Sequence, residues 1–267
     1  MFGTVIVLAA GVAGAGFVGA RRAFHRQWEL SEMKSNFVSS VSHELRAPIA
    51  SVRLLAESLE QGRIPGQEKQ HDYYHLIVQE CRRLTIFIEN VLDFSRIEQG
   101  RKKFEFEPAD LSALARQTVQ LMEPQALERS IKLLLALEAT PNGPLELVCD
   151  GLSLQQALVN LIDNALKHAP EGTEISIGLQ ESDGICRLWV EDHGSGIPAE
   201  DHERIFEPFY RRGSELRRET QGVGIGLTIV KHTVEAHGGR VVVRSAVGQG
   251  SRFTMELPVK REVVERM

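Results

Sequence analysis

The chain has 267 residues, of which 42% are hydrophobic and 25% are charged, as in an ordinary globular protein. A chain of this length has room for two modest domains, or for one domain with extensions. The net charge of −5 argues against a general nucleic-acid binder, which normally carries a basic excess. The three cysteines, Cys81, Cys149 and Cys186, have no paired spacing, which argues against a disulfide framework or a zinc site.

The chain opens with an apolar segment. Residues 1–20 contain no charged side chain, and Thr4 is their only polar one. As a helix the segment would span about 28 Å, close to the hydrocarbon core of a bilayer. Because Arg21, Arg22 and Arg26 follow it, we expect a single-pass membrane anchor, with the rest of the chain cytoplasmic. The alternatives are a cleaved signal, which normally begins with positive charge, and an artefact of the gene start.

A short connector at residues 21–35 leads into two predicted amphipathic helices. In the first, from residue 32 to about residue 61, apolar residues recur at spacings of three, four or seven. Pro48 is expected to interrupt and bend this helix, because its ring clashes with a preceding carbonyl group. A turn rich in glycine and proline follows, and the second helix runs from about residue 69 to residue 97. Residues 36–100 are therefore predicted to form a helical-hairpin domain.

The apolar stripes of these two helices are too wide to be buried against one another alone. Pairing with a second copy of the hairpin in a four-helix bundle would cover them, which predicts a homodimer. The alternative is that the hairpin packs on the C-terminal domain of its own chain.

From residue 101 the sequence alternates between strand and helix patterns. Strands are expected at residues 104–107, 131–137, 145–149, 174–179, 186–191, 240–245 and 252–257. Helices are expected at residues 110–127, 152–168 and 224–237. This order predicts an α+β sandwich over residues 101–260, a sheet covered on one face by helices, followed by a charged tail at residues 261–267.

An asparagine pair lies on the second of these helices. Asn160 and Asn164 are four residues apart, so their amides share one face, and Lys167 follows one turn later. Carboxamide oxygens are hard, neutral ligands suited to Mg²⁺, which keeps water and substrate phosphate oxygens in its shell. The alternative interpretation is that the two asparagines merely face solvent.

The second motif is Asp192-His193-Gly194-Ser195-Gly196, at the end of a predicted strand. The carboxylate of Asp192 can accept a hydrogen bond from the exocyclic amine of adenine. Gly194 and Gly196 would let the backbone approach the base and the ribose. The alternative is an ordinary turn, in which aspartate and glycine are common.

Two glycine motifs follow. Gly222, Gly224 and Gly226 precede a predicted helix, where glycines expose backbone N–H groups to phosphate. Gly248-Gln249-Gly250 comes between the last two predicted strands. Each glycine motif is weak evidence alone.

His43 lies early on the first predicted helix, in the sequence Ser-His-Glu-Leu-Arg-Ala-Pro. A neutral imidazole is a nucleophile, and Glu44 can hold or accept the proton of the other ring nitrogen. The chain has nine histidines, most of which must be surface residues. His71 and His75, for example, have no such motif around them.

In their order and spacing these motifs resemble those of bacterial two-component sensor histidine kinases, over roughly residues 32–258. Residues 33–49 resemble the phosphoacceptor box of that family. The later motifs, together with Phe206-Glu207-Pro208-Phe209, resemble the ATPase fold shared by histidine kinases, DNA gyrase and DNA mismatch-repair ATPases.

The resemblance implies that His43 accepts a phosphoryl group from Mg²⁺-ATP and passes it to an aspartate of a separate response regulator. It implies that Asn164 coordinates Mg²⁺ with help from Asn160, and that Asp192 reads adenine. A nucleotide-driven clamp related to gyrase, or a degenerate kinase acting as a dimeric scaffold, are the alternatives.

The same resemblance assigns phosphate contacts to Lys167 and Arg211, with Arg212 as the alternative to Arg211. It also implies that residues 210–221 form a mobile lid over the nucleotide. This segment is rich in arginine and glutamate, as a flexible cover should be.

Overall fold

The computed structural model describes residues 17, 19–21, 24, 37–137, 145–211 and 223–259. Most of the predicted anchor, connector and lid, and the whole predicted tail, lie outside these ranges, as do Arg212 and Gly222. Within the described part of the chain, none of the helices combines the length and apolar character needed to cross a membrane.

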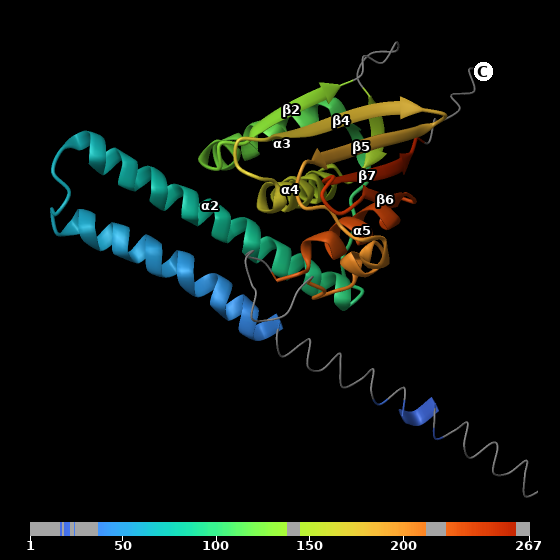
Figure 1. Cartoon of the computed structure of the whole chain (residues 1–267), viewed down its shortest axis with the longest axis horizontal. Coiled ribbons are helices and arrows are strands. Elements are labelled where there is room, and N and C mark those ends of the chain that lie inside the picture. The colour runs from blue at the N-terminus through green and yellow to red at the C-terminus, as the bar shows by residue number, and fades with distance from the viewer. Residues whose placement is uncertain are drawn as a thin grey trace, which may run out of the picture.

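Two antiparallel helices form the predicted hairpin, which extends away from the rest of the molecule (Figure 1). Residues 37–60 are helical without a break, so the interruption expected at Pro48 is wrong. The second helix, α2, spans Gln67–Glu98 and confirms the expected range. Gly62 and Gly66 in the turn have φ angles of 63° and 91°, a region that glycine enters without the steric cost of a Cβ atom.

The C-terminal domain is built on a five-stranded sheet in the order β2-β4-β5-β7-β6, beside a small sheet of β1 and β3. β2 pairs parallel with β4, and the other pairs are antiparallel. The strands are β1 (Glu107–Asp110), β2 (Lys132–Leu137), β3 (Glu146–Cys149), β4 (Glu174–Ser182), β5 (Ile185–Asp192), β6 (Arg240–Ser245) and β7 (Ser251–Pro258).

The first strand is displaced from its expected position at residues 104–107. It begins at Glu107, and residues 101–106 have no regular structure. Phe104 and Phe106 pack their rings against histidines at the end of α5, with centroids 5.9 Å from His232 and 4.9 Å from His237. The aromatic residues that suggested a strand therefore anchor the connection between the two domains.

Three helices cover one face of the five-stranded sheet: α3 (Leu111–Glu128), α4 (Gly151–His168) and α5 (Gly226–Ala236) (Figure 1). Asp110 and Asp150 cap the first two, because their side chains accept hydrogen bonds from N–H groups of the first turn. Along β5 and β7 buried and partly buried residues alternate, as expected for a sheet with one packed face. The predicted α+β architecture is confirmed.

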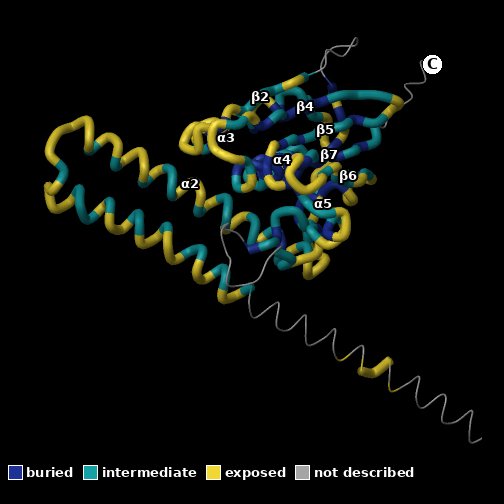
Figure 2. Tube along the Cα trace, viewed as in Figure 1, coloured by how far each residue is buried: buried dark blue, intermediate teal, exposed yellow. Residues whose placement is uncertain are grey.

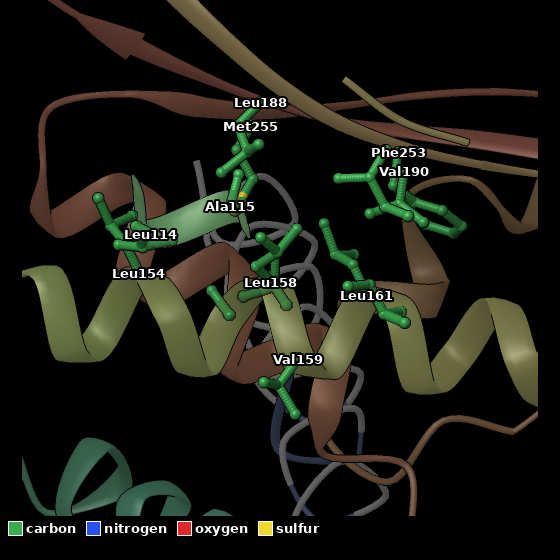
Figure 3. Packing of buried hydrophobic residues seen from close by; sticks show 14 of the residues in the cluster. Leu114, Ala115, Leu154, Leu158, Val159, Leu161, Leu188, Val190, Phe253 and Met255 are labelled. Carbon is green, nitrogen blue, oxygen red and sulfur yellow. The ribbon is translucent and has the colours of Figure 1, made fainter. Parts of the chain in front are cut away.

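The helix α4 lies at the centre of the core. Leu158 and Leu161 point toward Leu188 and Val190 of the sheet, whereas Val159 points the opposite way (Figure 3). All five side chains are buried. Because α4 is packed on both sides, a polar side chain that is buried on this helix needs a hydrogen-bond partner from another element.

One carboxylate joins three neighbouring strands on the other face of the sheet. Glu256 of β7 accepts hydrogen bonds from Arg240 of β6 at 2.7 Å and from Arg187 of β5 at 3.2 Å. The Arg240 hydrogen bond, aided by Arg187 and opposed by partial burial, holds the pKa of Glu256 below its ordinary value.

We expect Glu256→Gln to lower the free energy of unfolding by about 1 kcal/mol at pH 7. Because the folded pKa is lowered, this stabilisation is complete above the unfolded value of about 4.3, and it disappears as pH falls through the folded pKa. Urea unfolding at pH 7 and near pH 3 should therefore show a difference between the two proteins that shrinks in acid. Glu235→Gln, which affects an exposed pair with Lys231 at 3.9 Å, should have no measurable effect.

Candidate functional site

The asparagine pair lies on α4 where this helix meets α5. Asn160 is only 5% exposed, whereas Asn164, one turn later, is half-buried. A Cβ atom added at Gly226, the first residue of α5, would lie 3.6 Å from Oδ1 of Asn160. The structure therefore brings Asn160 together with the glycine motif. The alternative that both asparagines simply face solvent is wrong for Asn160.

The loop after β5 is held by its own aspartate. Asp192 is 4% exposed, and its Oδ1 accepts a hydrogen bond of 2.7 Å from the N–H of Gly194. Burial raises the pKa of Asp192 above its ordinary value, although hydrogen bonds from Gly194 and Ser251 oppose the rise. These N–H groups favour the charged form of the Asp192 carboxylate. Its remaining lone pairs can accept further hydrogen bonds but cannot donate any.

The glycines of this loop are required by close backbone contacts. A Cβ atom at Gly194 would lie 2.4 Å from the carbonyl oxygen of His168, at the end of α4. A Cβ atom at Gly250 would lie 2.0 Å from the carbonyl oxygen of Asp192. The end of α4, the Asp192 loop and the turn before β7 therefore converge at one place.

The residues that flank the predicted lid segment are joined by a backbone hydrogen bond. The N–H of Phe209 donates to the carbonyl of Gly224 at 2.9 Å, and Gly224 has a φ angle of 75°. A Cβ atom there would come within 3.0 Å of the backbone of Phe209 and Tyr210. The helix α5 then begins at Gly226, and the side chain of its N-cap residue, Ile225, forms no capping hydrogen bond. The first N–H groups of a helix are the ones that can bind an anion.

Two cations flank the end of α4. Lys167 forms an ion pair of 2.5 Å with Asp163, one turn earlier, and both side chains are partly exposed. The pKa of His168 lies below its ordinary value because its ring is partly desolvated and the charge of Lys167 lies beside it; Arg211 adds to the effect. The positive charges of Lys167 and Arg211 therefore both act on the ring of His168.

His43 and Glu44 lie on a different element, the first helix of the hairpin. His43 is exposed and Glu44 is half-buried. The nucleophile suggested by the sequence is thus accessible, and it belongs to the hairpin rather than to the group of loops around Asp192.

The hairpin contacts the ATPase-like domain, an arrangement that the sequence suggested only as the alternative to a dimer and without naming the residues involved. Asn90 of α2 exchanges hydrogen bonds with Asn160, and its Oδ1 also accepts from Gln156 at 2.8 Å. Beside it, the rings of Phe37, Phe94 and Phe209 lie with centroids 4.8 to 5.7 Å apart. The C-terminal half of α2 thus packs on its own chain. In the sequence, this contact is recognisable only from Asn90, a polar residue between the apolar residues Ile88 and Val91 of that helix.

Comparison with known families decides what this arrangement belongs to. The family described as "His Kinase A (phospho-acceptor) domain" matches residues 33–100. The family described as "Histidine kinase-, DNA gyrase B-, and HSP90-like ATPase" matches residues 149–261. The chain belongs to the two-component sensor histidine kinases.

Curated relatives agree with this family. The chain is 37% identical to the alginate biosynthesis sensor protein KinB of Pseudomonas aeruginosa over 245 residues. These residues are 91% of this chain and 39% of that protein. It is 30% identical over 238 residues to the sensor histidine kinase WalK of Bacillus subtilis, covering 88% and 38% of the two chains. The chain therefore spans about two fifths of the length of these relatives.

Solved structures of the family share the fold. Full-length ShkA in complex with AMPPNP matches with a TM-score of 0.57 and 30% identity, over 82% of this chain and 45% of that one. The histidine kinase ThkA in complex with the response regulator protein TrrA matches with a TM-score of 0.53 and 25% identity, over 84% and 62%.

Proposed function

We propose that this chain is a protein-histidine kinase, which transfers the γ-phosphoryl group of Mg²⁺-ATP to His43 and then to an aspartate of a response regulator in trans. The observation that carries the proposal is that α4 has the Asp192 loop at its end and the start of α5 beside Asn160, in a chain with an exposed His43 on its hairpin. ShkA was solved with AMPPNP, and ThkA with a response regulator, which supports both the nucleotide and the partner.

Each residue of the site has a proposed role. Asp192 accepts a hydrogen bond from the adenine amine, which its buried carboxylate suits. The carboxamide oxygens of Asn164 and Asn160 would hold Mg²⁺, which neutralises phosphate charge when bound. They fit a hard cation because both are neutral oxygen ligands and both belong to one face of α4.

Phosphate is held by backbone and by cations. The N–H groups of Gly224 and Gly226 at the start of α5, with Gly222 assigned from the sequence motif alone, would donate to phosphate oxygens. Lys167 and Arg211 add positive charge from the end of α4 and the beginning of the lid. To bind phosphate, Lys167 must give up its ion pair with Asp163. Its side chain is 26% exposed, which leaves it room to move.

The chemical step is an in-line displacement. The unprotonated ring nitrogen of His43 attacks the γ-phosphorus as the bond to the oxygen of ADP breaks, so ADP leaves with the electron pair. Glu44 holds the proton on the other nitrogen and raises the basicity of the attacking one. Phosphohistidine then donates the same group to the partner's carboxylate.

The protein is proposed to act as a homodimer attached to the bacterial inner membrane. Along the hairpin several large apolar side chains remain 45 to 66% exposed, and Figure 2 shows how open this part of the molecule is. They are Val38, Ile49, Leu54, Tyr74, Leu76, Val78, Ile88 and Leu92. A second hairpin would cover them. The apolar segment at residues 1–20, with arginines after it, supports the anchor.

The proposed kinase is tested by incubating the full chain, in detergent or vesicles, with γ-labelled ATP and Mg²⁺. The protein should acquire label that is stable to base and labile to acid. His43→Gln and Asn164→Ala should abolish the label, whereas His71→Gln, an exposed histidine of α2, should retain it. Label that survives His43→Gln would refute the acceptor, and nucleotide binding without label would favour a scaffold.

A further inference from the structure

Asn160 is engaged by the hairpin. Its Oδ1 accepts a hydrogen bond of 2.8 Å from Nδ2 of Asn90, and its Nδ2 donates one of 3.1 Å back to Oδ1 of Asn90. The two carboxamides thus pair reciprocally across 70 residues of sequence, between α2 and α4. With Asn160 only 5% exposed, this pairing takes up the amide that the proposed nucleotide site needs.

A third hydrogen bond fixes the amide of Asn90. Its Oδ1 also accepts from Nε2 of Gln156 at 2.8 Å, one turn before Asn160 on α4. Asn90 therefore spans two consecutive turns of α4. A buried amide with satisfied donors and acceptors holds its neighbours in place, and each partner becomes costly to leave unpaired.

The contact extends from Asn90 to the start of α5. Phe94, one turn later on α2 and 4% exposed, packs with Ile225 and Ile229. Ile225 precedes Gly226, the residue whose Cα faces the amide of Asn160. Docking of α2 and the arrangement of the nucleotide motifs are thus parts of one contact region.

We propose that Asn90 restrains the nucleotide site, because the docked hairpin and bound Mg²⁺-ATP compete for the carboxamide of Asn160. This inference rests on the proposed function. By linkage, nucleotide binding then weakens the docking of α2 by the same factor by which docking weakens nucleotide binding. ATP thereby releases its own domain from α2, which frees that domain to approach His43.

The test measures the dissociation constant for Mg²⁺-ATP in the full chain, by displacement of a fluorescent trinitrophenyl-ATP. Asn90→Ala should bind about fivefold more tightly than the wild type, since the competing hydrogen bonds are removed. Gln156→Leu, which removes one bond of the three, should tighten binding by a smaller factor. Glu89→Ala, an exposed neighbour on α2, should match the wild type.

Tighter binding separates competition from damage, because a merely structural role would leave affinity unchanged or weaken it. Hydrogen exchange provides the second readout: Mg²⁺-ATP should speed exchange in residues 86–98 of the wild type, and Asn90→Ala should show faster exchange there without nucleotide. Unchanged or weaker binding in both Asn90→Ala and Gln156→Leu would overturn the competition. A wild type that binds no Mg²⁺-ATP would instead refute the proposed nucleotide site.

Discussion

Replacement of Gly196 by alanine is expected to destabilise the ATPase domain by roughly 2–5 kcal/mol and to abolish nucleotide binding. Gly196 has a φ angle of 68°, a conformation that costs any residue with a Cβ atom about 1–2 kcal/mol. The added Cβ atom would also lie 1.9 Å from the carbonyl oxygen of Ala246, a backbone atom that no side-chain rotation can remove. To relieve the clash, the two loops must separate, which breaks the 2.8 Å hydrogen bond from the N–H of Gly248 to Ser195.

Gly184→Ala is the matched control for this prediction. Gly184 has a φ angle of 72°, but a Cβ atom there would have no heavy atom within 4 Å. Urea unfolding should therefore show that Gly184→Ala lowers the free energy of unfolding by about 1 kcal/mol, which is the cost of the backbone conformation alone. Displacement of a fluorescent nucleotide should show wild-type affinity in the same variant. Equal losses of stability in the two variants would contradict the proposed clash.

The regular elements could be predicted because each depends on a short-range pattern. Alternation of apolar residues predicted β5 and β7 to within one residue at each end, and the helical spacing predicted α4 likewise. Packing of one face against a core produces such patterns in any fold. The glycines of the Asp192 loop could be predicted as a motif. Their reason, contact with the backbone of His168 and Ala246, appears only in three dimensions.

Other features could not be predicted from the sequence, for different physical reasons. The short turns of helix η1 (Ala199–Asp201) and η2 (Arg204–Phe206) have no periodicity long enough to recognise. Phe104 has the composition of a strand but packs on His232. The ion pair of Lys167 with Asp163 was recognisable from its spacing of four residues.

The contact of Asn90 with Asn160 was the most consequential omission. Seventy residues separate the two amides, and an asparagine on an amphipathic helix ordinarily faces solvent. Only the approach of α2 to α4 makes it a partner of the proposed site. The sequence analysis also treated a dimer and packing on the same chain as mutually exclusive, although different parts of the hairpin can do each. The end of α2 packs on its own chain, while other apolar side chains of the hairpin stay exposed.

Asp192→Asn is expected to weaken ATP binding at least about 100-fold while leaving the fold intact. The asparagine has nearly the same shape and can still accept the hydrogen bond from the N–H of Gly194 through Oδ1. Its new NH₂ group, however, is a donor that would face the amine of adenine, also a donor. Guanine carries a carbonyl oxygen at that position, so the preference for ATP over GTP should fall. Competition of the two nucleotides for a fluorescent analogue measures both effects.

Stability distinguishes this loss of recognition from a loss of structure. Because burial raises the pKa of Asp192, the folded protein carries its charged form at pH 7 at a cost that the unfolded chain does not bear. Asp192→Asn removes that charge, so its free energy of unfolding should equal or exceed that of the wild type. Asp183→Asn, in the exposed turn between β4 and β5 at a φ angle that asparagine tolerates, should retain wild-type ATP binding. If Asp192→Asn were instead clearly less stable, its carboxylate would serve the loop rather than adenine.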